Sequence, residues 1–198
     1  ACTDIVGNGN VASSSFTLNV DRKDPTITAT PSQTTNATAN NYQKSQSVTI
    51  NVADEGAGLL SSNSYQYFLS NSSTALSGGT WTDYTSGTAF TIGTGLTGDY
   101  YLFVKTVKDN VTDDEKNVSS SAGTIKTIDG TTYHMFGTYK FDNTSPYWQI
   151  GTPSIDYTNK NVTVDIIGTD EHSGYGANSL DIDDIEVWVD GTKITNVT

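Results

Sequence analysis

The sequence predicts an all-β protein that folds as a β-sandwich, and two observations support this. The first is an alternating run of aromatic, aliphatic and β-branched residues at 98–107, Gly-Asp-Tyr-Tyr-Leu-Phe-Val-Lys-Thr-Val. Such residues favour strands, in which successive side chains leave opposite faces of the sheet. The second is a chain rich in Ser, Thr, Asn, Asp and Gly with only 34% apolar residues, which suits turns and solvated sheet faces better than helices. We therefore expect residues 98–107 to form the central strand.

Shorter runs on either side of the central run predict the remaining strands. Pro25 has no N–H for a sheet ladder, so it marks a strand start or a boundary. After it, strands are predicted at 26–30, 48–52, 64–70, 81–84, 89–92 and 138–141. Residues 123–128 and 131–135 are predicted to form a hairpin, because Asp129-Gly130 between two such runs is a strong turn signal. We interpret this hairpin as an insertion near residues 119–134.

Several landmarks of the chain occur twice in the same order. The joint Val20-Asp21-Arg22-Lys23-Asp24-Pro25 is matched by Phe141-Asp142-Asn143-Thr144-Ser145-Pro146. The later matches are Thr30-Pro31 with Thr152-Pro153, residues 48–52 with 162–166, and residues 54–58 with 170–174. A repeat of about 120 residues has the length of a domain rather than of a solenoid unit. The sequence thus predicts one complete domain at 22–142, the terminal loop and strand of a preceding domain at 1–21, and the first part of a following domain at 143–198.

These landmarks resemble the bacterial immunoglobulin-like repeats of cell-surface and secreted proteins. In that family an aspartate and, a few residues later, a proline open the repeat, as they do at 21–25. The other matching features are, in order, a Val-Thr-Val-type strand at 48–52, an Asp and Gly turn at 54–58, a Trp segment at 81–84, Gly-x-Tyr-Tyr-Leu at 98–102, and a Gly-Asn loop end at Gly7-Asn8. The middle unit departs from the pattern, because Asp113-Asp114-Glu115-Lys116-Asn117 stands where Gly-Asn is expected. The resemblance implies immunoglobulin-like β-sandwich repeats in tandem.

The resemblance also implies how the core is built. Gly98-x-Tyr100, followed by Leu102, resembles a tyrosine corner, in which a buried Tyr bonds to nearby backbone. Leu102 then stands where antibody domains have a Cys, and Cys2 is the only cysteine, so no disulfide can form within the chain. The expected core residues are Val48, Ile50, Val52, Tyr67, Leu69, Trp81, Tyr100, Leu102 and Val104.

The charge of the chain and its few reactive side chains disfavour several classes of function. A net charge of −12 disfavours nucleic acid and anionic membrane surfaces, which attract clustered Lys and Arg. His134 and His172 are the only histidines, and a Ser-His-Asp triad would need one of them to face a serine and a carboxylate. Two separated histidines and one cysteine do not predict a zinc site. We expect no enzyme activity and no direct membrane insertion.

Clustered carboxylates make calcium the one candidate cofactor, because this ion prefers carboxylate and carbonyl oxygens. The weak candidates are Asp181, Asp183 and Asp184. Further acidic groups are Asp109 with residues 113–115, and Asp21, Asp24 and Asp142 of the two joints. None of these runs matches an EF-hand loop, and solvated acidic turns are the simpler interpretation.

Aromatic residues are the candidates for ligand binding, because an exposed ring can stack on a sugar. Trp81, Tyr84 and Trp148 are the weak candidates, with Tyr133, Tyr147 and Trp188 as further members of such a platform. The alternative is that these rings pack in the core or between domains, as large aromatic side chains commonly do.

The expected function is a non-enzymatic structural or adhesive module. It would form part of a tandem immunoglobulin-like array that projects a binding region at a bacterial cell surface. Its expected partners are the neighbouring domains of the same chain and a host or cell-surface glycan or protein, and its expected location is extracellular. The alternative is a carbohydrate-binding or spacer module of a secreted glycan-degrading enzyme.

Overall fold

The computed structural model describes residues 5–7, 15, 17–34, 42–111, 118–151, 166–170, 172, 187–189 and 191–194. Every regular element in this part of the chain is a strand. The strands are β1 (Thr26–Thr30), β2 (Gln46–Ala53), β3 (Gln66–Ser70), β4 (Trp81–Asp83), β5 (Ala89–Ile92), β6 (Gly98–Lys105), β7 (Ser120–Ser121), β8 (Thr124–Ile128), β9 (Thr131–Phe141), β10 (Tyr147–Ile150), β11 (Ile166–Thr169), β12 (Val187–Val189) and β13 (Thr192–Ile194). The prediction of an all-β protein is confirmed.

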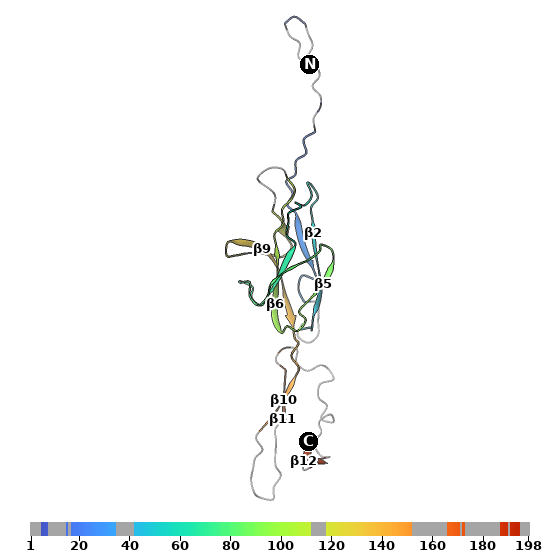
Figure 1. The fold of residues 1–198 in the computed structure, drawn as a ribbon, viewed down its shortest axis with the longest axis vertical. Coiled ribbons are helices and arrows are strands. Elements are labelled where there is room, and N and C mark those ends of the chain that lie inside the picture. Colours follow the sequence, from blue (N-terminus) through green and yellow to red (C-terminus); the bar gives the residue numbers. More distant parts are fainter. Residues whose placement is uncertain are drawn as a thin grey trace.

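Two sheets between residues 26 and 141 form the main body of the structure (Figure 1). One has the strand order β5-β2-β1-β7, and the other has the order β4-β3-β6-β9-β8. All neighbouring strands are antiparallel except β1 and β7. The predicted central strand is β6, which lies in the middle of the five-stranded sheet. The two-sheet arrangement is compatible with the predicted β-sandwich.

The core lies between the two sheets and draws on both of them. Val48, Ile50, Leu102 and Val104 are fully buried there, as the alternation in β2 and β6 predicts. Ile27, Tyr139 and Phe141 are also fully buried, although the sequence analysis did not select them. Four further predicted core residues are partly buried against the same cluster, namely Val52, Tyr67, Leu69 and Tyr100.

Trp81 does not belong to this core. It packs in a second apolar cluster with Phe68, Phe103 and Tyr133, which lies on the opposite face of the five-stranded sheet. The Phe103 side chain is 0% exposed even though it alternates with the core residues of β6. Antiparallel sheets commonly leave one face to solvent. Here the outer face of β6 is apolar around Phe103, where aromatic rings cover it.

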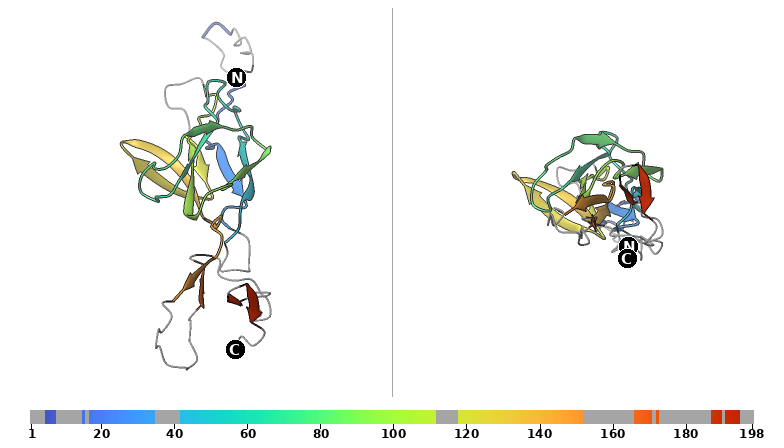
Figure 2. Two further views of the ribbon diagram at one scale, coloured as in Figure 1. Left: turned by 60° about the horizontal axis from the view of Figure 1, so that its bottom comes forward. Right: turned by 90° about the horizontal axis from the view of Figure 1, so that it is seen from below.

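The predicted hairpin forms, but its second strand is longer than expected. β8 pairs with β9 through a turn at Asp129 (φ 49°) and Gly130 (φ 77°), and a type I′ turn requires positive φ at both positions. The hairpin extends from the side of the main body (Figure 2, yellow). β9 then continues to Phe141 along β6, with a register shift near Tyr100 and Leu102. The two runs predicted as separate strands at 131–135 and 138–141 are therefore one strand.

The buried tyrosine that bonds to backbone is Tyr139 and not Tyr100. The Tyr139 hydroxyl donates to the carbonyl oxygen of Pro31 at 2.7 Å, and burial raises the pKa of this phenol, so it stays protonated. Within the described residues the Tyr100 hydroxyl has no hydrogen bond, and its ring packs against Phe141 at 5.9 Å. The tyrosine corner expected at Tyr100 is thus not formed there.

β10 and β11 form an antiparallel pair beyond the end of the main body at which β9 finishes (Figure 1). β12 and β13 form a second antiparallel pair. The described residues include no helix with the length and apolar character needed to cross a membrane.

Candidate functional site

The two histidines lie in different settings, and among the described residues His134 is the one that faces a serine. His134 is 0% exposed in β9, and its Nε2 lies 2.8 Å from Oγ of Ser119. The same Oγ accepts a hydrogen bond from the N–H of Val107 at 3.0 Å. Nδ1 of His134 has no partner among the described residues, whereas a catalytic triad places a carboxylate there. We interpret the pair as a structural contact that ties residue 119 to the end of β6.

Burial of His134 predicts a loss of stability in mild acid. Desolvation lowers the pKa of His134 below its ordinary value of 6.5. The unfolded chain therefore binds a proton that the folded chain does not, and the free energy of unfolding falls as the pH drops below 6.5. This single group contributes a slope of at most about 1.4 kcal/mol per pH unit. Urea titrations at several pH values would measure it.

The matched control for this prediction is His134→Gln, measured over the same pH range. The difference in unfolding free energy between the two proteins cancels the other titrating groups. That difference should shrink as the pH falls from 7 towards 5. Parallel pH profiles for both proteins would show that His134 does not carry the effect.

Of the predicted aromatic candidates, Trp81 and Tyr133 pack together with ring centroids 5.4 Å apart, but Tyr84 lies in the other apolar cluster. Tyr84 is buried between the sheets, with its ring against Tyr65 at 5.8 Å and Phe90 at 6.5 Å. Trp81 is on the outer face of the five-stranded sheet, where Nζ of Lys105 lies 4.9 Å from its ring centroid. Trp148 is in β10, and its side chain lies outside the described part of the structure. Trp81 and Tyr84 thus lie on opposite faces of the sheet and do not form one platform.

The predicted calcium candidates Asp181, Asp183 and Asp184 lie outside the described residues, as do residues 113–115 and Cys2. Asp109 is buried and accepts a hydrogen bond from the N–H of Val111 at 3.3 Å. Within the described ranges, His, Cys, Asp and Glu side chains form no group of three or more that could hold a metal ion.

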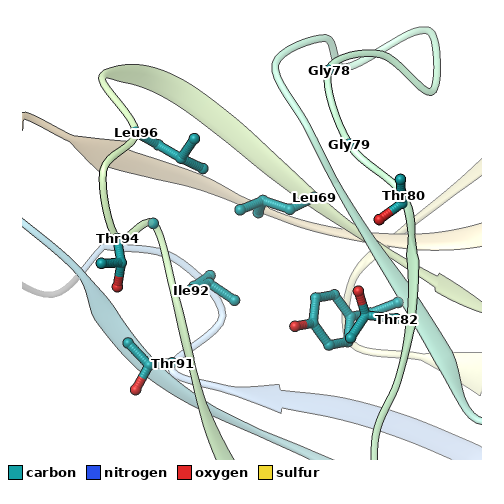
Figure 3. A pocket seen from close by; sticks show the side chains of 11 residues that line it. Leu69, Gly78, Gly79, Thr80, Thr82, Thr91, Ile92, Thr94 and Leu96 are labelled. Carbon is teal, nitrogen blue, oxygen red and sulfur yellow. The ribbon is translucent and has the colours of Figure 1, made fainter.

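A groove opens between the edge strands β4 and β5 of the two sheets (Figure 3). It has a volume of about 270 Å³. Thr80 and Thr82 stand on one wall, Thr91 and Thr94 stand on the other, and apolar side chains lie between them. The complete lining is Tyr67, Leu69, Gly78, Gly79, Thr80, Thr82, Thr91, Ile92, Gly93, Thr94 and Leu96. The groove has hydroxyl and backbone groups but no charged side chain, so its chemistry suits binding of a neutral molecule rather than acid–base catalysis.

The first joint, residues 21–25, is fastened to the loop that follows β2. The Asp21 carboxylate accepts hydrogen bonds from the N–H of Lys23 at 3.0 Å and from the N–H of Ala57. These two bonds hold the pKa of Asp21 below its ordinary value. Lys23 also pairs with Glu55, but both side chains are exposed, and such ion pairs contribute little. Asp21 thus connects the incoming chain to the body of the sandwich.

Gly56 packs so closely against the Asp21 carboxylate that there is no room for a side chain at position 56. An added Cβ would lie 2.0 Å from Oδ2 of Asp21. Gly56→Ala must therefore displace the carboxylate from the N–H groups of Lys23 and Ala57, which should lower the midpoint of thermal unfolding. A double-mutant cycle with Asp21→Ala is the control, because Gly56→Ala should cost little once the carboxylate is absent. Additive effects in thermal melts would contradict the contact.

The second joint, residues 142–146, is fastened to the opposite end of the sandwich. Nδ2 of Asn143 lies 3.0 Å from the carbonyl oxygen of Lys44, 3.2 Å from that of Gly93 and 2.6 Å from that of Leu96, so its two N–H groups serve three acceptors and one hydrogen is shared. Its backbone N–H donates to Oγ1 of Thr97 at 3.1 Å. Two separate segments of the sandwich, the loop of residues 93–97 and the chain just before β2, therefore converge on Asn143, which fixes the path of the outgoing chain.

The strand pairs that follow the two joints have the same register. The residue after Pro25 pairs with the residue before Asp54, as Thr26 with Ala53. The residue after Pro146 pairs with the residue before Asp170, as Tyr147 with Thr169. Counted in this way, β11 matches residues 50–53, and the match of 162–166 with 48–52 drawn from the sequence is displaced by two residues.

The carboxylates at these positions also make matching bonds. Oδ1 of Asp21 accepts the N–H two residues later, at 3.0 Å, and Oδ1 of Asp142 does the same with Thr144 at 3.0 Å. Asp54 accepts the N–H of Gly56 at 3.3 Å, and Asp170 accepts the N–H of His172 at 3.1 Å.

Both joints were predicted as landmarks, and the only role expected of their side chains was calcium binding by Asp21, Asp24 and Asp142. Asp and Asn commonly accept the N–H two residues later, so Asp21 and Asp142 were recognisable as turn formers. No sequence signal identified the three carbonyl partners of Asn143, because they are distant along the chain.

Comparison of the chain with protein-family models, with curated proteins and with solved structures finds no match.

Proposed function

We propose that the chain is a non-enzymatic structural module from a tandem array of immunoglobulin-like domains, which projects a binding region at a bacterial cell surface. The observation that carries this proposal is the pair of fastened joints. Asp21 holds the chain where β2 ends, and Asn143 holds it beside Lys44, just before β2 begins. The chain therefore enters and leaves at opposite ends of the sandwich, in fixed directions, which suits a module that keeps its neighbours apart.

The strand order supports the immunoglobulin-like part of the proposal. If β1, β2, β3, β4, β5, β6 and β9 are lettered A, B, C, C′, E, F and G, the sheets contain E-B-A and C′-C-F-G. That division of strands is the one found in immunoglobulin-like sandwiches. The equal registers of β1 with β2 and of β10 with β11 support a second unit of the same kind after Pro146.

Small-angle X-ray scattering of the full chain tests the spacer role. We expect an elongated profile in which the parts on either side of the second joint keep a defined spacing. Asn143→Ala should weaken that spacing while the sandwich remains folded. The outer-face variant Tyr101→Leu, which lies away from both joints, is the control and should leave the profile unchanged. A wild-type profile typical of a freely jointed chain would contradict the proposal.

A second candidate function is carbohydrate binding, and the groove between β4 and β5 favours it. Sugars present hydroxyl groups and apolar C–H faces, and this groove presents threonine hydroxyls beside Leu69, Ile92 and Leu96. A glycan array probed with the full chain tests this candidate. Binding that is lost in Thr91→Val and retained in Thr127→Val, on the distant strand β8, would favour it over a pure spacer. A chain that binds no glycan would count against it.

A further inference from the structure

The two matching turns, at 54–58 and 170–174, differ at their third residue. Gly56 is the second residue after Asp54, and His172 is the second residue after Asp170. Both donate their N–H to the preceding aspartate, so their backbones are held alike. Gly56 lies against Asp21 with no space for a side chain. His172 carries a ring, and this ring lies against Tyr42.

The His172 ring contacts Tyr42, which belongs to the sandwich. The two ring centroids are 5.3 Å apart at an interplanar angle of 68°, an edge-to-face arrangement that aromatic rings prefer. Both side chains are partly buried. This contact joins the turn after β11 directly to the residues that precede β2.

The position of Tyr42 is fixed by the last strand of the sandwich. The N–H of Gln43 donates to the carbonyl of Lys140 at 3.2 Å, and the N–H of Asp142 donates to the carbonyl of Gln43 at 3.0 Å. Nζ of Lys140 also lies 5.3 Å from the centroid of the Tyr42 ring. The ring is therefore held in place at the end of β9 and is available as a docking surface for the next unit.

We propose that His172 docks on Tyr42 and so sets the angle between the sandwich and the unit that follows it. This inference rests on the proposed tandem array and adds the residue that orients one joint. In each turn, the residue two positions after the aspartate (Asp54 or Asp170) then decides whether that unit docks on the preceding one. A histidine there makes a contact, and a glycine, as at position 56, presents no side chain to the unit before it.

The test uses NMR spectroscopy of the full chain. We expect nuclear Overhauser contacts between the ring protons of His172 and Tyr42, together with a ring-current shift of the His172 ring protons. Both should be lost in Tyr42→Leu. The matched control is Tyr101→Leu, another partly buried tyrosine that lies on the outer sheet face, and it should leave both signals in place. Absence of the ring–ring contacts in the wild-type chain, or a ring-current shift of His172 that persists in Tyr42→Leu, would overturn the contact.

A second measurement tests whether the orientation of the two units across the second joint is fixed. Nitroxide labels at Thr85→Cys in the sandwich and Ile167→Cys in β11, with Cys2→Ser, report the distance across the second joint. We expect one narrow distribution that broadens in His172→Gly and is kept in His172→Phe. A wild-type distribution as broad as that of His172→Gly would overturn the inference. The docking of His172 and the spacer function can fail separately. If the scattering profile is elongated and unchanged in His172→Gly, and the wild type shows no ring contact, the docking is overturned and the spacer function is retained.

Discussion

Replacing Gly93 with alanine is expected to destabilise the sandwich by about 3 kcal/mol, the largest effect we expect from a single methyl group. Gly93 follows β5 at φ +88°, and an added Cβ would lie 2.1 Å from the nearest atom of the Phe141 ring. Phe141 is fully buried at the end of β9, so its ring cannot move outward. The substitution therefore combines overpacking with a backbone conformation that L-residues rarely adopt.

Gly95→Ala in the same loop separates these two causes. Gly95 has a similar φ of +73°, but an added Cβ there meets no atom within 4 Å. It should cost only the backbone term, about 1–2 kcal/mol. Urea titration of both variants gives the difference, which measures the clash with Phe141. Equal losses in the two variants would mean that the Phe141 ring relaxes without cost.

The sequence was sufficient to predict the elements that depend on local pattern. Alternation in 98–107 located β6, and the Asp129-Gly130 pair located the β8–β9 turn. Val48, Ile50, Leu102 and Val104 were expected core residues, and all four are buried at alternating positions of β2 and β6. These features require no knowledge of which strand lies beside which.

The features that were missed depend on contacts between distant strands. The sequence around Phe103 does not reveal whether its face of the sheet is solvated or covered. The pairing of β6 with β3 and β9 brings Trp81, Phe68 and Tyr133 around it. The tyrosine bond was assigned to Tyr100 by resemblance. The residue that reaches a backbone acceptor is Tyr139, because β9 passes beside Pro31.

The joints show the same division between local and distant information. Asp21 and Asp142 each bond two residues ahead, which a local pattern can indicate. Asn143 follows β9 of one sheet and bonds to Lys44, Gly93 and Leu96, which the pairing of β2 with β5 brings together in the other sheet. Residue type alone therefore marks the position of the second joint, and the fold determines how firmly that joint is held.

Replacing Asn143 with aspartate is the second large effect that we expect. The side chains have nearly the same size, but the Asp side chain would direct a carboxylate oxygen at the three carbonyl oxygens that now accept from Nδ2. Loss of these hydrogen bonds and the added repulsion should lower the unfolding free energy by about 3 kcal/mol at neutral pH. Asn143→Ala removes the donor without adding charge, so its loss should be smaller, about 2 kcal/mol.

The pH dependence of the aspartate variant distinguishes repulsion from a simple loss of hydrogen bonds. Carbonyl oxygens around the new carboxyl group would raise its folded-state pKa above the unfolded value of about 3.9. The penalty is then complete above the folded-state pKa and disappears as the pH falls below the unfolded one. The stability of Asn143→Asp should accordingly approach that of Asn143→Ala in acid, measured as the difference between the two variants. If that difference is independent of pH, the carboxylate does not face the carbonyl groups, and the second joint is not held through the Asn143 side chain.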